Sequence, residues 1–357
     1  MQMINEEALR KYIIRRFEGV SRVDIRKLGS GVQGSGFLVE VQSASGVRSY
    51  VVKTLLSEGL GHDYPSDRAG VFLLDLDEYK NLPKHVKAID VLAELEDGDI
   101  KSIGGGKEYY LLMEKTEGRD YFKDLAEFAD KTVLAPPDRE KIKAMAAYLA
   151  GIHAVKKDSR ALYWRKVRDT VGHGECLMGV FDTYPDGTLG YGEMAEIEKL
   201  CVDWRARLKP KADRLSMIHG DFHPGNIWFT GGGDLCAPDF VLLDRSRGPW
   251  GEPADDVTAL AINYIFFSII RDGLVAGPYY EGLTLFFEEY TRASQDEELF
   301  EVLAPFFAFR GAVVANPVFY PDISSETRRT VFTFIRNVLL ADRFEPRRVN
   351  DYLGAHN

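Results

Sequence analysis

The chain has little cysteine, no excess of basic residues and no long uncharged run. Its three cysteines are far apart and show no CxxC spacing, so neither a disulfide framework nor a cysteine-based zinc site is indicated. The formal net charge of −10 argues against a dedicated nucleic-acid binder, which needs clustered Lys and Arg. The longest uncharged run, 257–270, is too short to cross a bilayer and is expected to be a buried helix.

The N-terminus lacks the uninterrupted apolar core of a signal peptide, because charged residues recur between positions 6 and 16. There is no internal repeat and no low-complexity tract. The chain has 357 residues, of which 45% are hydrophobic and 28% charged. These values predict a soluble globular protein with two domains or lobes and no membrane span, and the sparse cysteines fit a reducing cytoplasm.

Residues 216–226 read SMIHGDFHPGN, an apolar lead-in followed by a tight turn. Asp221 and Asn226 are held on this turn, five residues apart. In phosphoryl transfer an aspartate accepts the proton of the attacking hydroxyl, and an asparagine nearby holds a magnesium ion. The alternative interpretation is an ordinary turn of Asp, Asn, Gly and Pro.

A glycine-rich stretch, 29–36, reads GSGVQGSG and contains Gly29, Gly31 and Gly34 in GxGxxG spacing. Such glycines allow backbone N–H groups to approach phosphate oxygens closely. A dinucleotide-binding GxGxxG opens a helix, whereas here a β-rich segment and a hairpin turn follow, which favours the phosphate-covering loop of a kinase. A glycine-rich hairpin without a ligand is the alternative.

The next expected strand, 49–55, places Lys53 among β-branched and aromatic residues. In a kinase-like lobe a lysine here reaches the α- and β-phosphates and pairs with a glutamate on the following helix. That helix is expected at 71–81, after a loop at 57–70, and Glu78 is chosen within it because glutamate has the reach. Alternatively, Lys53 faces solvent on an edge strand.

Further strands are expected at 85–95 and 109–113, with a glycine-rich turn at 97–107 and a hinge after residue 113. The chain then becomes helical, with a helix that opens at Pro136 and ends at His153, which we expect to be a hydrogen-bonded packing residue. Residues 159–210 are interpreted as an inserted helical segment. After the catalytic turn, an apolar strand ends at Asp244, where a second metal ligand would sit.

These motifs, in this order, resemble those of the aminoglycoside phosphotransferase and choline kinase-like family, relatives of the protein kinases. The resemblance covers nearly the whole chain and rests most on HGDFHPGN at 219–226, LD at 243–244 and GEPADDV at 251–257. It implies an α+β, two-lobed protein-kinase-like fold. A small β-rich N-lobe, 1–113, would bind the nucleotide phosphates, and a large, mainly helical C-lobe, 114–357, would carry the catalytic loop.

The resemblance also implies the cofactors ATP and Mg²⁺, with GTP left open, and a role for each matching residue. Arg245, Ser246 and Arg247 follow the metal-binding aspartate, where family members often have an aromatic or acidic residue. Glu252 stands where an aspartate is common. Neither departure removes a catalytic group.

The implied roles are phosphate binding for Lys53 with Glu78 as its partner, catalysis for Asp221, Mg²⁺ binding for Asn226 and Asp244, bracing of the catalytic loop for Asp256, and adenine contact for Met113, Glu114 and Lys115.

Only residues 245–255 separate the metal-binding aspartate from the next helix, which leaves little room for the peptide platform of a protein kinase. We therefore expect ATP- and Mg-dependent phosphate transfer to a hydroxyl of a small molecule of amino-sugar, sugar or amino-alcohol type. The alternatives are a protein kinase and a catalytically silent, nucleotide-binding pseudokinase; the joint presence of the lysine, both aspartates and the asparagine argues against the latter. The acidic residues of 159–210 could attract a cationic substrate, but basic residues in the same segment favour a solvated, mixed-charge surface. The oligomeric state is not predicted.

Overall fold

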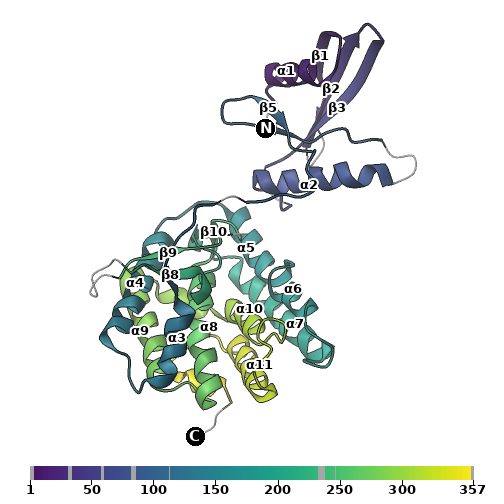
Figure 1. Ribbon diagram of the computed structural model, residues 1–357. Helices are drawn as coiled ribbons and strands as arrows, with labels where there is room; N and C mark the ends of the chain where they lie inside the picture. The colour runs from purple at the N-terminus through teal and green to yellow at the C-terminus, as the bar shows by residue number, and fades with distance from the viewer. Residues whose placement is uncertain are drawn as a thin grey trace. The chain divides into compact units, whose positions relative to one another are not determined.

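The computed structural model describes residues 4–30, 34–57, 60–81, 86–111, 113–231, 238–245 and 247–354. They form two compact units: unit 1, Met1–Met113, and unit 2, Glu114–Asn357. Unit 1 contains a small antiparallel sheet, and unit 2 is larger and mainly helical (Figure 1). This is the α+β arrangement of the protein-kinase-like fold, as expected from the sequence.

The core of unit 1 lies between a three-stranded antiparallel sheet and one helix. The strands are β1 (Val20–Ser30), β2 (Gly34–Ser43) and β3 (Gly46–Leu55), in the order β1-β2-β3. Side chains of β2 alternate between buried and half-buried positions, because successive residues of a strand point to opposite faces.

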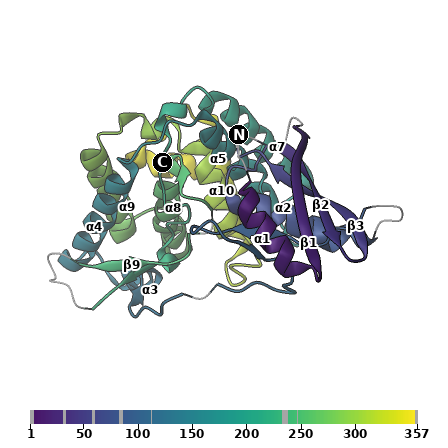
Figure 2. The ribbon, with the colours of Figure 1, turned by 90° about the horizontal axis from the view of Figure 1, so that it is seen from above.

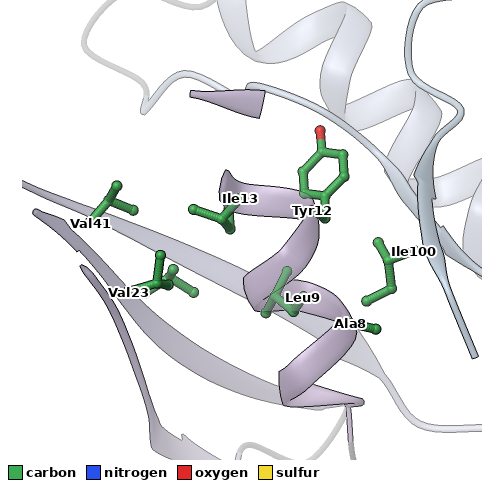
Figure 3. Close-up of a cluster of buried hydrophobic side chains, with 8 residues drawn as sticks. Ala8, Leu9, Tyr12, Ile13, Val23, Val41 and Ile100 are labelled. Atoms are coloured by element: carbon green, nitrogen blue, oxygen red, sulfur yellow. The ribbon is translucent and has the colours of Figure 1, made fainter. Parts of the chain in front are cut away.

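Helix α1 (Glu6–Arg16) lies along this sheet, as Figure 2 shows from above. Its apolar residues face the buried side chains of β1 and β2 (Figure 3), so the expected N-terminal surface helix contributes one face to a core. The Asn5 side chain caps the helix by accepting a hydrogen bond from the Ala8 amide at 3.1 Å. The buried cluster comprises Ala8, Leu9, Tyr12, Ile13, Val23, Val39, Val41 and Ile100.

The second helix begins earlier than predicted. Helix α2 spans Pro65–Glu78, so the expected loop at 57–70 ends at Tyr64. Pro65 suits the first helical position because its missing N–H would have no helical partner there. The Asp67 carboxylate accepts a hydrogen bond from the Tyr64 amide at 2.7 Å and closes the first turn. These local signals outweighed the polar composition on which the loop prediction rested.

The strand prediction at 109–113 is wrong for its described residues. Tyr109, Tyr110, Leu111 and Met113 lie outside any strand, and each of these side chains is more than half exposed. The expected glycine-rich turn instead contains a strand, β5 (Ile100–Ser102), which pairs with β4 (Leu92–Glu94). The pairing is favoured because it buries Ile100 against α1.

Unit 2 is built around α8 (Pro253–Asp272), which is packed against α4 (Pro136–His153), α9 (Gly277–Ser294) and α10 (Ala304–Val314). Helix α4 has the predicted bounds. The segment 159–210 is helical as predicted and forms α5 (Arg160–Gly172), α6 (Leu177–Asp182) and α7 (Tyr191–Leu208). Other α-helices of this unit are α3 (Tyr121–Glu127), α11 (Ser325–Leu340) and α12 (Val349–Tyr352).

Helix α8 is the one described helix that is long and apolar enough to cross a membrane by length and composition. Of its apolar window, 89% is buried inside the protein. The core helix of a globular unit passes the same test, and the expectation of a buried helix over 257–270 is confirmed. Cys176 and Cys201 are buried free thiols in unit 2, and Cys236 lies outside the described residues.

Candidate active site

The catalytic turn predicted at 216–226 lies between a two-stranded and a three-stranded sheet of short strands in unit 2. Strand β7 (Ser216–Met217) leads into it and pairs with β10 (Trp250–Gly251). The turn ends in a 3₁₀ turn, Pro224–Asn226, and continues as β8 (Ile227–Phe229), which pairs with β9 (Phe240–Leu242). Gly220 has φ +90°, a backbone conformation that L side chains rarely adopt, so a glycine is required there.

The carboxylate of Asp256, in the first turn of α8, fixes the backbone of this turn. Its Oδ2 accepts a hydrogen bond from the His219 amide and its Oδ1 accepts one from the Gly220 amide, both at 2.7 Å. The prediction that Asp256 braces the catalytic loop is confirmed. His153 lies 3.2 Å from the same carboxylate through Nε2 and 2.8 Å from the Tyr290 hydroxyl through Nδ1, so it is a hydrogen-bonded packing residue as expected.

Replacing Asp256 by alanine is expected to release the catalytic turn. Two buried amides, of His219 and Gly220, would lose their acceptor, at about 1–3 kcal/mol each. A displacement of about 1 Å at the reacting groups lowers turnover about 100-fold. Urea unfolding and kcat measure the two effects. Asp256→Asn keeps one accepting oxygen and should fall between wild type and Asp256→Ala, whereas equal values for all three proteins would contradict the bracing role.

Asp221 is buried, with 7% of its surface exposed, and carries an ion pair on one oxygen. Arg310 Nη1 and Arg247 Nη1 each lie 2.5 Å from Asp221 Oδ1. Burial alone would raise the pKa of this carboxyl, but the two guanidinium groups outweigh burial and hold the pKa below its ordinary value. Asp221 is therefore ionised at neutral pH.

Asn226 and Asp244 are the predicted metal ligands, and backbone hydrogen bonds connect their segments to Asp221. The Asn226 side-chain amide donates to the Asp221 carbonyl at 3.0 Å, which commits its nitrogen and leaves its oxygen as an acceptor. The Leu243 amide donates a hydrogen bond to the Asn226 carbonyl at 3.0 Å, and Asp244 is the residue that follows Leu243 in the chain. Asp244 is exposed and has φ +51°. One carboxylate and one amide oxygen suit Mg²⁺, which takes its other ligands from phosphate and water.

Among the described residues no group of three or more His, Cys, Asp or Glu side chains could hold a metal ion. The pair of Asn226 and Asp244 is not such a group, because it has two residues and asparagine is not one of these four residue types. The donor chemistry of Asn226 and Asp244 therefore fits magnesium, which prefers oxygen, and does not fit zinc, which is bound mainly by sulfur and nitrogen.

The predicted phosphate-binding residues lie in unit 1. Gly29 and Gly34 are in β1 and β2, and Gly31 lies outside the described residues. A Cβ at Gly34 would lie 1.9 Å from the Thr54 carbonyl oxygen, so close strand packing already requires this glycine. Lys53 is exposed on β3, which is an edge strand of the described sheet.

Glu78 is the last residue of α2, and its Oε2 accepts a hydrogen bond from Asn81 at 3.1 Å. No ion pair joins it to Lys53 among the residues that the structure describes. Met113, Glu114 and Lys115 are exposed coil, and Lys115 pairs with Glu117 at 2.9 Å. The structure therefore joins Asn226 to Asp221 and to the strand end that precedes Asp244, and it shows no contact between Lys53 and Glu78 among the described residues.

The buried ion pairs that connect Asp221 to Arg310, Asp255 and Lys166 were not predicted from the sequence. Arg310 Nη2 donates to the Gly220 carbonyl at 3.0 Å and to Asp255 Oδ1 at 2.7 Å. Lys166 Nζ lies 2.6 Å from Asp255 Oδ2. The available signal was a single arginine within the apolar stretch 304–314, because a charge on an otherwise apolar helix is rarely buried without a partner.

A small sheet-containing unit, followed by a helical unit whose Asp–Asn turn is braced by an aspartate of the next helix, defines a kinase-like phosphotransferase. The sequence model described as the phosphotransferase enzyme family matches residues 24–277. The chain belongs to this family. The family resemblance of the motifs is thereby confirmed.

Solved structures similar to the chain were also found. They include an ethanolamine kinase of Plasmodium vivax (12% identity, 93% of this chain and 80% of that chain covered, TM-score 0.33). An aminoglycoside phosphotransferase from Streptomyces rimosus matches at 15% identity, with 85% and 99% covered and a TM-score of 0.34. The GDP complex of aminoglycoside 2′-phosphotransferase-IIIa matches at 12% identity, with 98% and 95% covered and a TM-score of 0.34. No curated protein sequence matches the chain.

Proposed function

We propose that the protein transfers the γ-phosphate of ATP to a hydroxyl of a small molecule, with Mg²⁺ as cofactor. The observation that carries the proposal is the state of Asp221. It is an ionised, buried carboxylate held through Oδ1, on a turn that Asp256 fixes. Within the described residues Oδ2 accepts no hydrogen bond, so this oxygen is the one we assign to the proton of the acceptor hydroxyl.

The other residues receive roles according to their chemistry. We assign Asn226 and Asp244 to Mg²⁺, which, when bound, neutralises charge on the phosphate oxygens. Lys53 is assigned to the α- and β-phosphates, and the glycine-rich stretch 29–36 to the phosphate oxygens. Residues 113–115 are assigned to contact with the adenine.

The short connection after Asp244 supports a small acceptor. Eight residues, 245–252, separate it from the start of α8 at Pro253. A peptide platform requires a longer segment, so protein substrates are disfavoured. Helices α5, α6 and α7 are the part of unit 2 that we assign to enclosing the acceptor and excluding water.

Two acidic side chains of α7 share one arginine. Glu193 pairs with Arg336 at 2.8 Å and also accepts from the Gly190 amide at 3.1 Å. Glu196 lies 3.6 Å from the same Arg336. These contacts do not select a charge for the acceptor, so sugars and amino alcohols are tested on equal terms with amino sugars.

A screen of acceptors tests the proposal. Release of the nucleoside diphosphate is measured with amino sugars, sugars, choline, ethanolamine and homoserine, as ADP when ATP is the donor and as GDP when GTP is the donor. At least one acceptor should raise this release above the rate of hydrolysis by water, and EDTA should abolish the increase. Transfer of labelled phosphate to added polypeptides alone would identify a protein kinase. An absence of thermal stabilisation by Mg·ATP would identify a protein without nucleotide binding.

A further inference from the structure

Two guanidinium groups converge on one oxygen of the candidate catalytic carboxylate. Arg310 comes from α10, and Arg247 comes from the short segment between Asp244 and β10. Each places Nη1 2.5 Å from Asp221 Oδ1. Both also lie over the ring of Phe309, with Cζ at 4.5 Å and 5.6 Å from its centroid. One carboxylate oxygen therefore has two cationic partners.

The two arginines differ in how firmly they are held. Arg310 has 4% of its surface exposed and also donates to the Gly220 carbonyl and to Asp255. Arg247 contacts Asp221 through Nη1, its buried Nε makes no hydrogen bond to a described residue, and its second carboxylate neighbour is Glu175 Oε2 at 3.9 Å. Arg310 is fixed by several partners, and Arg247 is held only by charge.

The buried charges of this cluster do not balance. Lys166 and Arg310 compensate Asp255 and Asp221, so the cluster is neutral before Arg247 is added. The carboxylate that remains to offset Arg247 is that of Glu175, which lies 3.9 Å away and whose side chain is 60% exposed. The planar guanidinium of Arg247, whose Nε makes no hydrogen bond to a described residue, is suited to bind the oxygens of a phosphoryl group in a forked geometry.

We propose that Arg247 is a catalytic residue that moves from Asp221 to the phosphoryl group during transfer. The inference rests on the proposed function. In the step, the acceptor hydroxyl gives its proton to Asp221 Oδ2 while its oxygen forms the bond to the γ-phosphorus of the nucleoside triphosphate. The bond between that phosphorus and the bridging oxygen breaks, and its electron pair leaves with the nucleoside diphosphate. Arg247 keeps all its protons and stabilises the charge on the phosphoryl oxygens, while Arg310 keeps its contact with Asp221.

Arg247→Met tests this role by binding as well as by turnover. An arginine that stabilises the transferring phosphoryl group contributes about 10³-fold or more to kcat. The binding probe is aluminium fluoride, which completes a planar mimic of that group with Mg·ADP. The variant should bind Mg·ADP as wild type does, lose most of the extra affinity that aluminium fluoride gives, and lose about 10³-fold in kcat. Arg247→Lys should recover part of both.

The matched control is Arg292→Met, which removes an arginine of α9 whose side chain is 73% exposed and paired with Glu289. It should leave binding and turnover unchanged. If aluminium fluoride tightens the complex of Arg247→Met as much as that of wild type, or if only the KM of the acceptor rises, the inference is overturned. Wild type that binds Mg·ADP but gains no affinity from aluminium fluoride overturns it as well. Wild type that binds no Mg nucleotide would instead refute the proposed function.

Discussion

Asp221→Asn is expected to lower kcat by about 10²–10⁴-fold, the contribution of a positioned general base. The amide keeps the shape of the side chain but cannot take the proton of the acceptor hydroxyl. Mg·ADP binding should persist, because the residues assigned to the metal and the phosphates are unchanged. Steady-state kinetics and titration calorimetry measure the two quantities, and Asp186→Asn, at an exposed carboxylate bonded to Tyr191, is the control.

The same substitution should change how stability depends on pH. The folded-state pKa of Asp221 is below its ordinary value of 3.8, so the carboxylate adds stability above the unfolded-state pKa and loses it as pH falls through the folded-state value. The asparagine side chain of the variant does not titrate and has no such dependence. The difference in unfolding free energy between wild type and Asp221→Asn should therefore shrink as the pH is lowered from 7 to below 4. A constant difference, or wild-type turnover in the variant, would contradict the assigned role.

The candidate site divides into a part that the sequence predicts and a part that it does not. Asp221 and Asn226 were found because their spacing is local and the tight turn is encoded by Gly220 and Pro224. Asp256 was found through the family motif. Arg310 lies 89 residues from Asp221 in the chain, and local patterns do not specify which charges meet across such a distance.

The fold shows the same division. Helix α4 has the predicted bounds because its N-terminal prolines and its apolar spacing agree. Strand β5 was missed because its three residues become a strand only when Ile100 is buried against α1. In both the fold and the site, contacts between distant segments decided what local propensity left open.

Breaking the pair of Arg214 and Glu252 is expected to produce the largest loss of stability. Glu252 is fully buried and accepts from Arg214 at 2.8–3.1 Å and from the Tyr163 hydroxyl at 2.8 Å. Arg214 also binds Asp296 through two hydrogen bonds of 2.7 Å. Arg214→Met leaves the buried charge of Glu252 uncompensated and should lower the unfolding free energy by about 3–5 kcal/mol. Glu252→Gln should cost less, because Arg214 keeps Asp296 as its partner.

A double-mutant cycle, measured by urea unfolding, distinguishes charge coupling between Arg214 and Glu252 from a simple loss of packing. The double variant Arg214→Met/Glu252→Gln should be less destabilised than the sum of the single variants, because neither charge is then left alone. The control pair, Arg168 and Asp169 on α5, has side chains 46% and 25% exposed. Its disruption should cost about 0–1 kcal/mol. Additive effects at Arg214 and Glu252 would refute the coupling.

Glu252→Asp tests a departure of this chain from the family pattern, because an aspartate is common in the family at this position. Aspartate keeps the charge but is one methylene shorter. It cannot reach Arg214 and Tyr163 together from the N-terminus of α8 without moving the helix, which also carries Asp256. Glu252→Asp should therefore lose stability and also turnover, through displacement of the catalytic turn, whereas Arg292→Met, at an exposed arginine of α9, should lose neither.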